Sequence, residues 1–194
     1  HRVDRRQRQM CIRDSSKVDR CPQLTAARLM LYSLVHINET SPYEVFAYKE
    51  DTVYFITDDG SEYLVGFIEE TNIGIQRAYQ LFIIKKRNGI HIGTDVKIGR
   101  TVSSIVHSFF RNPSNILVYI CDTSDKDQAA RDRKFKIWFK RYASLDDLVF
   151  VSEVIDVEDD SYFASMILSR RTTDFYQIQT TFHDYFQDLR SKLE

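Results

Sequence analysis

The sequence predicts an α+β fold, with a mixed and mainly antiparallel sheet, the element order ββββ-α-β-α-ββ-α and helices mainly on one face. Three observations predict this class. Short aromatic and β-branched runs with turn residues between them occupy positions 43–84. After them the spacing of apolar residues changes from two to nearer four, which is typical of helices. An almost wholly apolar run and two alternating runs then separate the helical patterns, which indicates strands and helices packed in layers.

The first four strands are expected to form a meander. Tyr43–Tyr48 and Thr52–Thr57 are separated by three residues, which is the length of a hairpin loop. Gly60 then supplies the left-handed backbone position that a second hairpin needs. The third strand is expected over Glu62–Glu69, and the fourth over Tyr79–Ile84.

A basic run, Lys85-Lys86-Arg87, closes the fourth expected strand together with Asn88 and Gly89. Such a run can contact phosphate. More often, charged residues at the end of a strand protect a sheet edge against aggregation, and the sequence favours that interpretation.

A helix is expected next, entered through Thr94 or Asp95 as its cap and stopped before Pro113. Its apolar stripe consists of Ile98, Val102, Ile105, Val106, Phe109 and Phe110. The following run, Ile116–Cys121, is almost wholly apolar and predicts a central strand that is covered on both faces.

Ser124 and Asp127 resemble a capping box, so a second helix is expected directly after this strand. Its buried face would consist of Phe135, Trp138, Phe139 and Tyr142. Leu148–Val157 and Tyr162–Ser169 are expected to form a hairpin around an acidic turn at 158–161. A last helix is expected from about Asp174, with Phe175, Ile178, Phe182, Tyr185, Phe186, Leu189 and Leu193 on one side.

Arg5–Ser15 resembles the in-frame translation of a transposase sequencing adapter, and we therefore interpret residues 1–29 as a non-native, disordered leader. The natural start is expected at Met30, with Leu34 or Val35 as alternatives. Residues 30–194 are then expected to form a single α+β domain with its core at 41–193.

The charge balance changes when the leader is removed. The chain has 27 Lys and Arg against 28 Asp and Glu, and residues 1–29 hold 8 and 3 of these, which leaves 19 and 25, a net charge of −6. An acidic domain is a poor general nucleic-acid binder. No apolar run approaches the length of a membrane helix, so a cytoplasmic protein without membrane contact is expected. Cys121 alone follows the expected start, which excludes a disulfide framework and a cysteine metal cage.

The most chemically suggestive residues follow the central strand. Asp122, Asp125 and Arg131 are candidate catalytic residues, and Asp122, Asp125 and Asp127 are candidate metal ligands. Carboxylates between a strand end and a helix start often bind metal or phosphate. The same residue types also cap the first turn of a helix, and capping is the interpretation that the sequence favours. Residue type alone leaves both alternatives open.

Two further sets of residues have ordinary explanations. Cys121 could act as a nucleophile with His107 or His91 as base, but a lone cysteine at the end of an apolar strand is usually a small buried hydrophobe. A group of acidic residues lies around the expected hairpin turn and comprises Glu153, Asp156, Glu158, Asp159 and Asp160. These carboxylates could bind a divalent cation, but we expect them to form a solvated hairpin tip. The chain has no phosphate-binding glycine loop and no dinucleotide fingerprint, so no cofactor is expected.

Several segments together resemble a known family. They are Ser41-Pro42-Tyr43, the hairpin from Tyr54–Thr57 to Tyr63–Val65, the strand end Tyr119–Asp122, and the helix residues Arg131, Phe135, Trp138 and Phe139. The chain is similar in these positions to an uncharacterised family of small Bacteroidota proteins, a domain of unknown function numbered six-one-six-nine. The resemblance covers roughly Ser41 to Leu193. It implies a bacterial origin and the domain boundaries, and it brings no assigned activity.

Two classes of function follow. The first is a non-enzymatic interaction or regulatory protein, such as an adaptor, antitoxin or immunity-like protein, whose acidic surface meets a basic protein partner. The alternative is a metal-dependent phosphotransfer enzyme or nuclease that uses Asp122, Asp125 and Arg131. A ligand-sensing domain is a third possibility. The sequence identifies neither the partner nor the oligomeric state.

Overall fold

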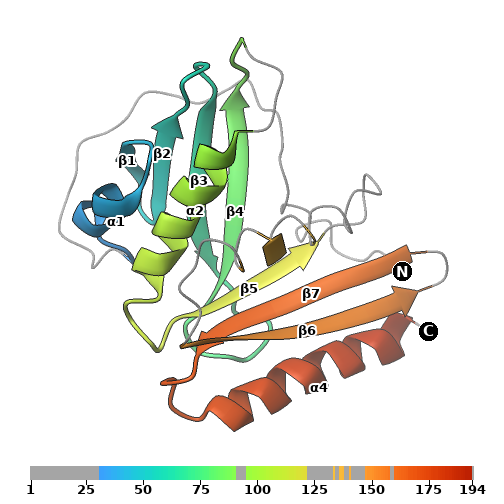
Figure 1. Cartoon of the computed structure of the whole chain (residues 1–194). Helices are drawn as coiled ribbons and strands as arrows, with labels where there is room; N and C mark the ends of the chain where they lie inside the picture. The colour runs from blue at the N-terminus through green and yellow to red at the C-terminus, as the bar shows by residue number, and fades with distance from the viewer. Residues whose placement is uncertain are drawn as a thin grey trace. The chain divides into compact units, whose positions relative to one another are not determined.

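The computed structural model describes residues 31–90, 95–121, 147–157 and 160–193, with positions 133, 136, 137 and 140. Seven strands form one sheet in the order β1-β2-β3-β4-β5-β7-β6 (Figure 1). The α+β class and the mixed, mainly antiparallel sheet are confirmed. The helices are α1 (Leu34–Thr40), α2 (Val96–Phe109) and α4 (Phe175–Leu193), and the strands are β1 (Val45–Lys49), β2 (Thr52–Ile56), β3 (Glu62–Glu69), β4 (Ala78–Arg87), β5 (Ile116–Cys121), β6 (Leu148–Val157) and β7 (Asp160–Ser169).

The chain divides into two compact units. One unit, which we call the helix-pair unit, comprises the described part of 12–67 together with Phe82–Arg111. The other, the C-terminal unit, comprises Ile68–Leu81 and the described part of 112–194. The division passes through β3 and β4, so the first residues of β4 belong to the C-terminal unit and the last six to the helix-pair unit.

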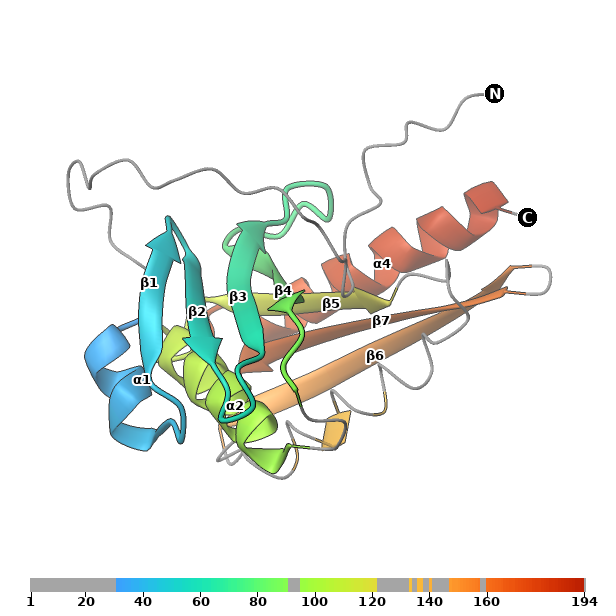
Figure 2. The same ribbon diagram turned by 90° about the horizontal axis from the view of Figure 1, so that it is seen from above.

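In the helix-pair unit, α1 and α2 lie on the same side of β1–β3 (Figure 2). Phe67 of β3 stacks on Phe109 of α2 with ring centroids 4.4 Å apart. Val53 and Val65 are fully buried. The predicted stripe of α2 is confirmed, since every member from Val102 to Phe110 is buried and Ile98 is half-buried. Because aromatic and β-branched side chains alternate along these strands, one face receives the helices.

Helix α1 was not expected from the sequence, and it protects the outer edge of β1. The Asn38 side chain accepts a hydrogen bond from the Val45 backbone N–H at 2.8 Å and donates one to the Val45 carbonyl at 2.9 Å. The amide thereby replaces a neighbouring strand. The register of β1 with β2 also shifts between Ala47 and Lys49. A side-chain cap and a bulge both make an edge strand a poor template for pairing.

The turn between β2 and β3 is fixed by hydrogen bonds. Asp59 accepts bonds from the Thr57 hydroxyl and from the Ser61 N–H and hydroxyl, which lower the pKa of Asp59 to about 2. The chain after β4 returns to this turn, where the Gly89 N–H donates to the Ser61 hydroxyl at 2.8 Å. The Ile90 N–H donates to the Asp59 carbonyl. The end of β4 is therefore held against the β2–β3 turn.

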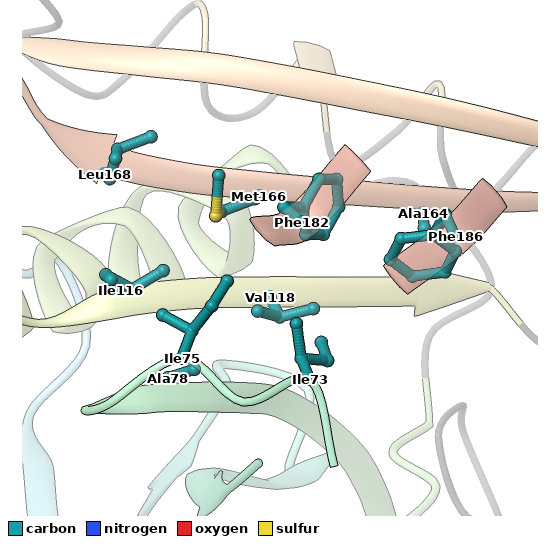
Figure 3. Close-up of a cluster of buried hydrophobic side chains, with 10 residues drawn as sticks. All are labelled: Ile73, Ile75, Ala78, Ile116, Val118, Ala164, Met166, Leu168, Phe182 and Phe186. Carbon is teal, nitrogen blue, oxygen red and sulfur yellow. The ribbon is translucent and has the colours of Figure 1, made fainter. Parts of the chain in front are cut away.

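The core of the C-terminal unit lies between β5, β7 and α4 (Figure 3). Phe182 and Phe186 of α4 pack against Met166 of β7 and Val118 of β5. The loop before β4 contributes Ile73 and Ile75, which are buried in the same cluster. The predicted apolar side of α4 is confirmed through Phe175, Ile178, Phe182, Tyr185, Phe186 and Leu189.

The predicted bounds of β1, β2, β4 and β7 were wrong. Strand β1 begins at Val45 rather than Tyr43 and ends one residue later than predicted, and β2 ends at Ile56 rather than Thr57. Strand β4 does not end at Ile84 but continues through the basic run to Arg87. Lys86 has a partner on β3, Glu62, at 3.3 Å, and this supports the longer strand. Strand β7 begins at Asp160, which pairs with Val157, so the hairpin turn is tighter than expected.

Among the described residues, no helix is both long and apolar enough to cross a membrane.

Gly89→Ala is expected to destabilise the protein by about 1 to 3 kcal/mol, the usual cost of overpacking. A Cβ at this position would lie 2.4 Å from the Asp59 carbonyl oxygen, which is backbone and held in the turn. Urea denaturation of the purified variant measures the loss.

Gly66→Ala is the matched control. Its Cβ would meet the end of the Phe82 ring at 2.5 Å and the Thr52 hydroxyl at 2.7 Å, both of which can move. An equal or larger loss for Gly66→Ala would contradict the assignment of Gly89 as the tighter contact.

Thr101→Val is expected to leave stability unchanged or to raise it by about 1 kcal/mol, since removing a buried hydroxyl without a partner removes its desolvation cost. Thr101 of α2 is fully buried, and its hydroxyl has no hydrogen-bond partner among the residues that the structure describes. Thermal unfolding compares this variant with Thr101→Ser, which keeps the hydroxyl, loses the methyl group and is expected to be less stable. A clear loss of stability in Thr101→Val would show that the hydroxyl has a partner in solution.

His183 of α4 lies 2.9 Å from Glu153 of β6, and this contact raises the pKa of His183 above 6.5. The ion pair stabilises the protein fully below the unfolded pKa, and the contribution disappears as pH rises through the folded pKa. Glu153→Gln is expected to return the pKa of His183 toward its ordinary value. An NMR titration of the imidazole measures the change, and an unchanged pKa in the variant would refute the pairing.

Candidate functional site

The residues that the sequence proposed as a catalytic or metal site lie outside the described residues. These are Asp122, Asp125, Asp127 and Arg131. Within the described part of the chain, no group of three or more His, Cys, Asp or Glu side chains is arranged to hold a metal ion. Helix capping by residues 122–131 therefore stays a prediction, and so does the alternative of a ligand site there.

The other sequence candidates are separated or only partly described. His107 of α2 is exposed. His91 lies outside the described residues, and so do Glu158 and Asp159 of the acidic group. Glu153 contacts His183 rather than a second carboxylate among the described residues.

The feature that stands out is the pairing of β4. On one side, the Glu70 N–H donates to the Ala78 carbonyl, so even-numbered residues of β4 direct their backbone groups toward β3. Phe82 opposite Gly66 and Lys86 opposite Glu62 continue the same register. Successive residues of a strand direct their backbone groups to opposite sides. Odd-numbered residues of β4 therefore direct their N–H and C=O groups away from β3.

The odd-numbered residues find a partner strand only at the start of β4. In the C-terminal unit β4 pairs with β5 in parallel through Ala78, Tyr79 and Gln80, and the Ile116 N–H donates to the Arg77 carbonyl. From Phe82 to Arg87, in the helix-pair unit, none of the described strands other than β3 pairs with β4. Among the described residues, the backbone groups of Ile83, Lys85 and Arg87 therefore form a free sheet edge, which we call the β4 edge.

The side chains along the β4 edge change in character along the strand. Phe82, Ile83 and Ile84 are half-exposed apolar residues. Lys85 lies over the Tyr63 ring at 5.8 Å, and its charge helps to lower the pKa of Asp59. Lys86 pairs with Glu62 and lies 5.4 Å from the Tyr48 ring.

Arg87 differs from the two lysines. Its guanidinium donates to the Gly60 carbonyl at 3.3 Å, and the described residues provide it with no carboxylate partner. Its side chain is exposed. The β4 edge thus combines free backbone groups, an apolar stretch and one cation without a countercharge.

The helix-pair unit holds this edge in place through a polar cluster at the start of α2. The Tyr43 hydroxyl donates to Asp95, the N-cap of α2, at 2.5 Å and accepts from the Asp58 N–H at 3.3 Å. Lys97 pairs with Asp58 at 2.6 Å and lies over the Tyr43 ring. Burial, and then the bond to Asp95, raise the pKa of Tyr43. These hydrogen bonds and the ion pair connect the start of α2 with the β2–β3 turn. Asp59 of that turn accepts a hydrogen bond from the chain after β4 through its backbone carbonyl.

The opposite face of the same strands carries aromatic side chains. Phe46 stacks on Tyr54 with centroids 5.2 Å apart, and Tyr48 meets Tyr54 edge-on at 6.4 Å. Lys86 extends toward Tyr48, and Leu64 is buried. Phe46 and Ile56 are 39% and 46% exposed, so part of this face is open apolar surface.

Glu70 is a buried carboxylate of the C-terminal unit, with 8% of its surface exposed. It accepts hydrogen bonds from the Asn72 N–H and side-chain amide, and from the Gln80 side chain. These donors compensate the carboxylate of Glu70 for its burial, and the bonds to Asn72 and Gln80 stabilise the loop between β3 and β4.

The sequence predicts a sheet edge at Lys85-Lys86-Arg87 but places the run after the strand, whereas the run lies inside β4. The sequence does not predict the Tyr43 cluster. The only available signal for the cluster was Asp95 as a cap, and nothing local connects it with Tyr43, 52 positions earlier.

Comparison with known proteins gives a match to a family model over part of the chain, and no activity. Residues 94–184 match the model of a family of unknown function (DUF6169). No curated protein matches the chain. The solved structure of a CoA-dependent acyl-homoserine lactone synthase, MesI, is similar with a TM-score of 0.33 and 8% identity over 70% of each chain, a likeness too weak to carry an argument. From the start of α2 into α4, the chain is therefore similar to a protein family whose function is unknown.

Proposed function

We propose that this chain is a non-enzymatic regulatory domain, of the adaptor, antitoxin or immunity-like kind, that binds an extended segment of a partner protein at the β4 edge. The observation that carries the proposal is the row of backbone groups at Ile83, Lys85 and Arg87, which no described strand pairs. An extended peptide can add to such an edge as a further strand, with main-chain hydrogen bonds giving affinity.

The treatment of the opposite sheet edge supports the proposal. At β1 the Asn38 side chain satisfies Val45, and a register shift disrupts the strand. Unprotected edges invite aggregation, and proteins blunt edges that have no use. Lys85, Lys86 and Arg87 place charges on the last part of the β4 edge, whereas Phe82, Ile83 and Ile84 before them are half-exposed and uncharged. The apolar part of the β4 edge is therefore consistent with an edge that is kept for a partner.

The rigidity of the β4 edge also supports the proposal. A peptide that adds to an edge that is already ordered does not have to order it, and the entropy of ordering is a main cost of binding. Asp59 and Gly89 fasten the end of β4, while Tyr43 and Asp95 fasten the adjacent helix.

Ile83→Pro tests the proposal because the one backbone hydrogen-bonding group that proline removes is the N–H that faces the free edge. The bonds to β3 come from even-numbered residues and stay in place, so the variant is expected to fold. Peptides selected on the wild-type protein from a phage-displayed random library should lose at least ~10-fold in affinity, equivalent to about 1.4 kcal/mol, for Ile83→Pro.

Ile83→Ala is the matched control, since it truncates the side chain and keeps the N–H, and its peptide affinity should stay close to that of the wild type. Amide hydrogen exchange checks the edge directly, with Ile83 and Lys85 exchanging faster than Phe82 and Ile84 in the free protein. If the library yields no binding peptide, or if selected peptides bind Ile83→Pro and wild type equally, the proposed function is refuted.

A further inference from the structure

The charges beside the β4 edge restrict the chemistry of its partner, an inference that rests on the proposed function. We propose that the segment that binds this edge is apolar at alternate positions and carries a carboxylate that pairs with Arg87.

The apolar part follows from the side chains that an added strand would meet. Side chains directly opposite each other on neighbouring strands lie about 4.5–5.5 Å apart at Cβ and interact in pairs. Phe82 and Ile84 lie on the same face of β4 and are half-exposed. A partner strand therefore gains most by placing apolar side chains, two residues apart, beside them.

The acidic part follows from the difference between the three cations at the end of β4. Lys86 already pairs with Glu62, and Lys85 lies over Tyr63 near Asp59. Arg87 donates only to a backbone carbonyl among the described residues. A guanidinium pairs with a carboxylate through two parallel hydrogen bonds, which is a stronger arrangement than a bond to a neutral carbonyl.

The position of Arg87 at one end of the edge also gives the interaction a direction. The apolar residues Phe82–Ile84 come first and the cation comes last. A peptide bound with its carboxylate at the wrong end would leave that charge beside apolar side chains. Charge placement of this kind determines register and partner choice more than affinity.

The neighbouring acidic groups do not remove the preference. Asp58 is paired with Lys97, and Asp59 is held by Thr57 and Ser61 within its turn. Asp95 accepts from Tyr43 and caps α2. The carboxylates around the end of β4 are therefore engaged with groups other than Arg87.

The experiment uses the full chain and the random peptide library described above. Selected peptides should be enriched in Asp or Glu at one end of an apolar alternation. For a selected peptide, replacing the acidic residue by its amide should weaken binding to the wild type by ~10-fold, with a smaller effect at high salt because ions screen the pair.

Arg87→Glu is the decisive variant. It should bind the acidic peptide more weakly than the wild type does, and it should bind a peptide with lysine in the same place more tightly than it binds the acidic peptide. Arg100→Glu changes the net charge equally on the exposed side of α2 and should leave both affinities unchanged.

The outcomes separate the two proposals. Peptides that require the Ile83 N–H but show no acidic preference, or that bind Arg87→Glu as well as wild type, overturn the carboxylate inference and leave the proposed function intact. Equal losses in Arg87→Glu and Arg100→Glu also overturn it, because they reduce the effect to general electrostatics. Failure to select any peptide overturns both proposals.

Discussion

The hydrogen bonding of strand β4 is the constraint on which the rest of the structure depends. A strand must satisfy backbone groups on both of its sides, and buried groups without partners are costly. On one side β4 neighbours β3, with a backbone bond at Ala78 and a side-chain contact at Lys86, while on the β5 side the parallel register covers only Ala78 to Gln80. The same strand thus joins the β5–β7 core at its beginning and carries a free edge at its end.

The helix-pair unit depends on polar ties as much as on its apolar core. Exposed ion pairs such as Lys97–Asp58 contribute little to stability by themselves. The Tyr43–Asp95 bond is different because Tyr43 is buried, and an unpaired hydroxyl or carboxylate at that place would be costly. These ties specify where α2 begins and how the β2–β3 turn closes.

The contrast between the two outer strands of the helix-pair unit links the structure to function. One edge is capped by the Asn38 amide and distorted by a register shift, and the other has no partner strand among the described residues. Both arrangements come from backbone chemistry rather than from a catalytic constellation, which is why recognition of an extended segment is the function proposed for this chain.

The sequence by itself determined the fold class and most elements, because these depend on local periodicity. β3, β5 and β6 have the predicted bounds, and the apolar stripes of α2 and α4 are the predicted ones. Charge and motif content narrowed the function only to broad classes. The candidates Asp122, Asp125, Asp127 and Arg131 stay predictions, since they lie outside the described residues.

Only the tertiary structure decided the features that depend on distant pairing. The extension of β4 through Lys85 and Lys86 requires partners on β3 that the local pattern, three consecutive cations, does not reveal. The joining of Tyr43 with Asp95, the capping of Val45 by Asn38 and the free backbone groups at Ile83 likewise depend on which strands become neighbours. Strand order is a property of the whole sheet, and residue type and spacing along one segment do not specify it.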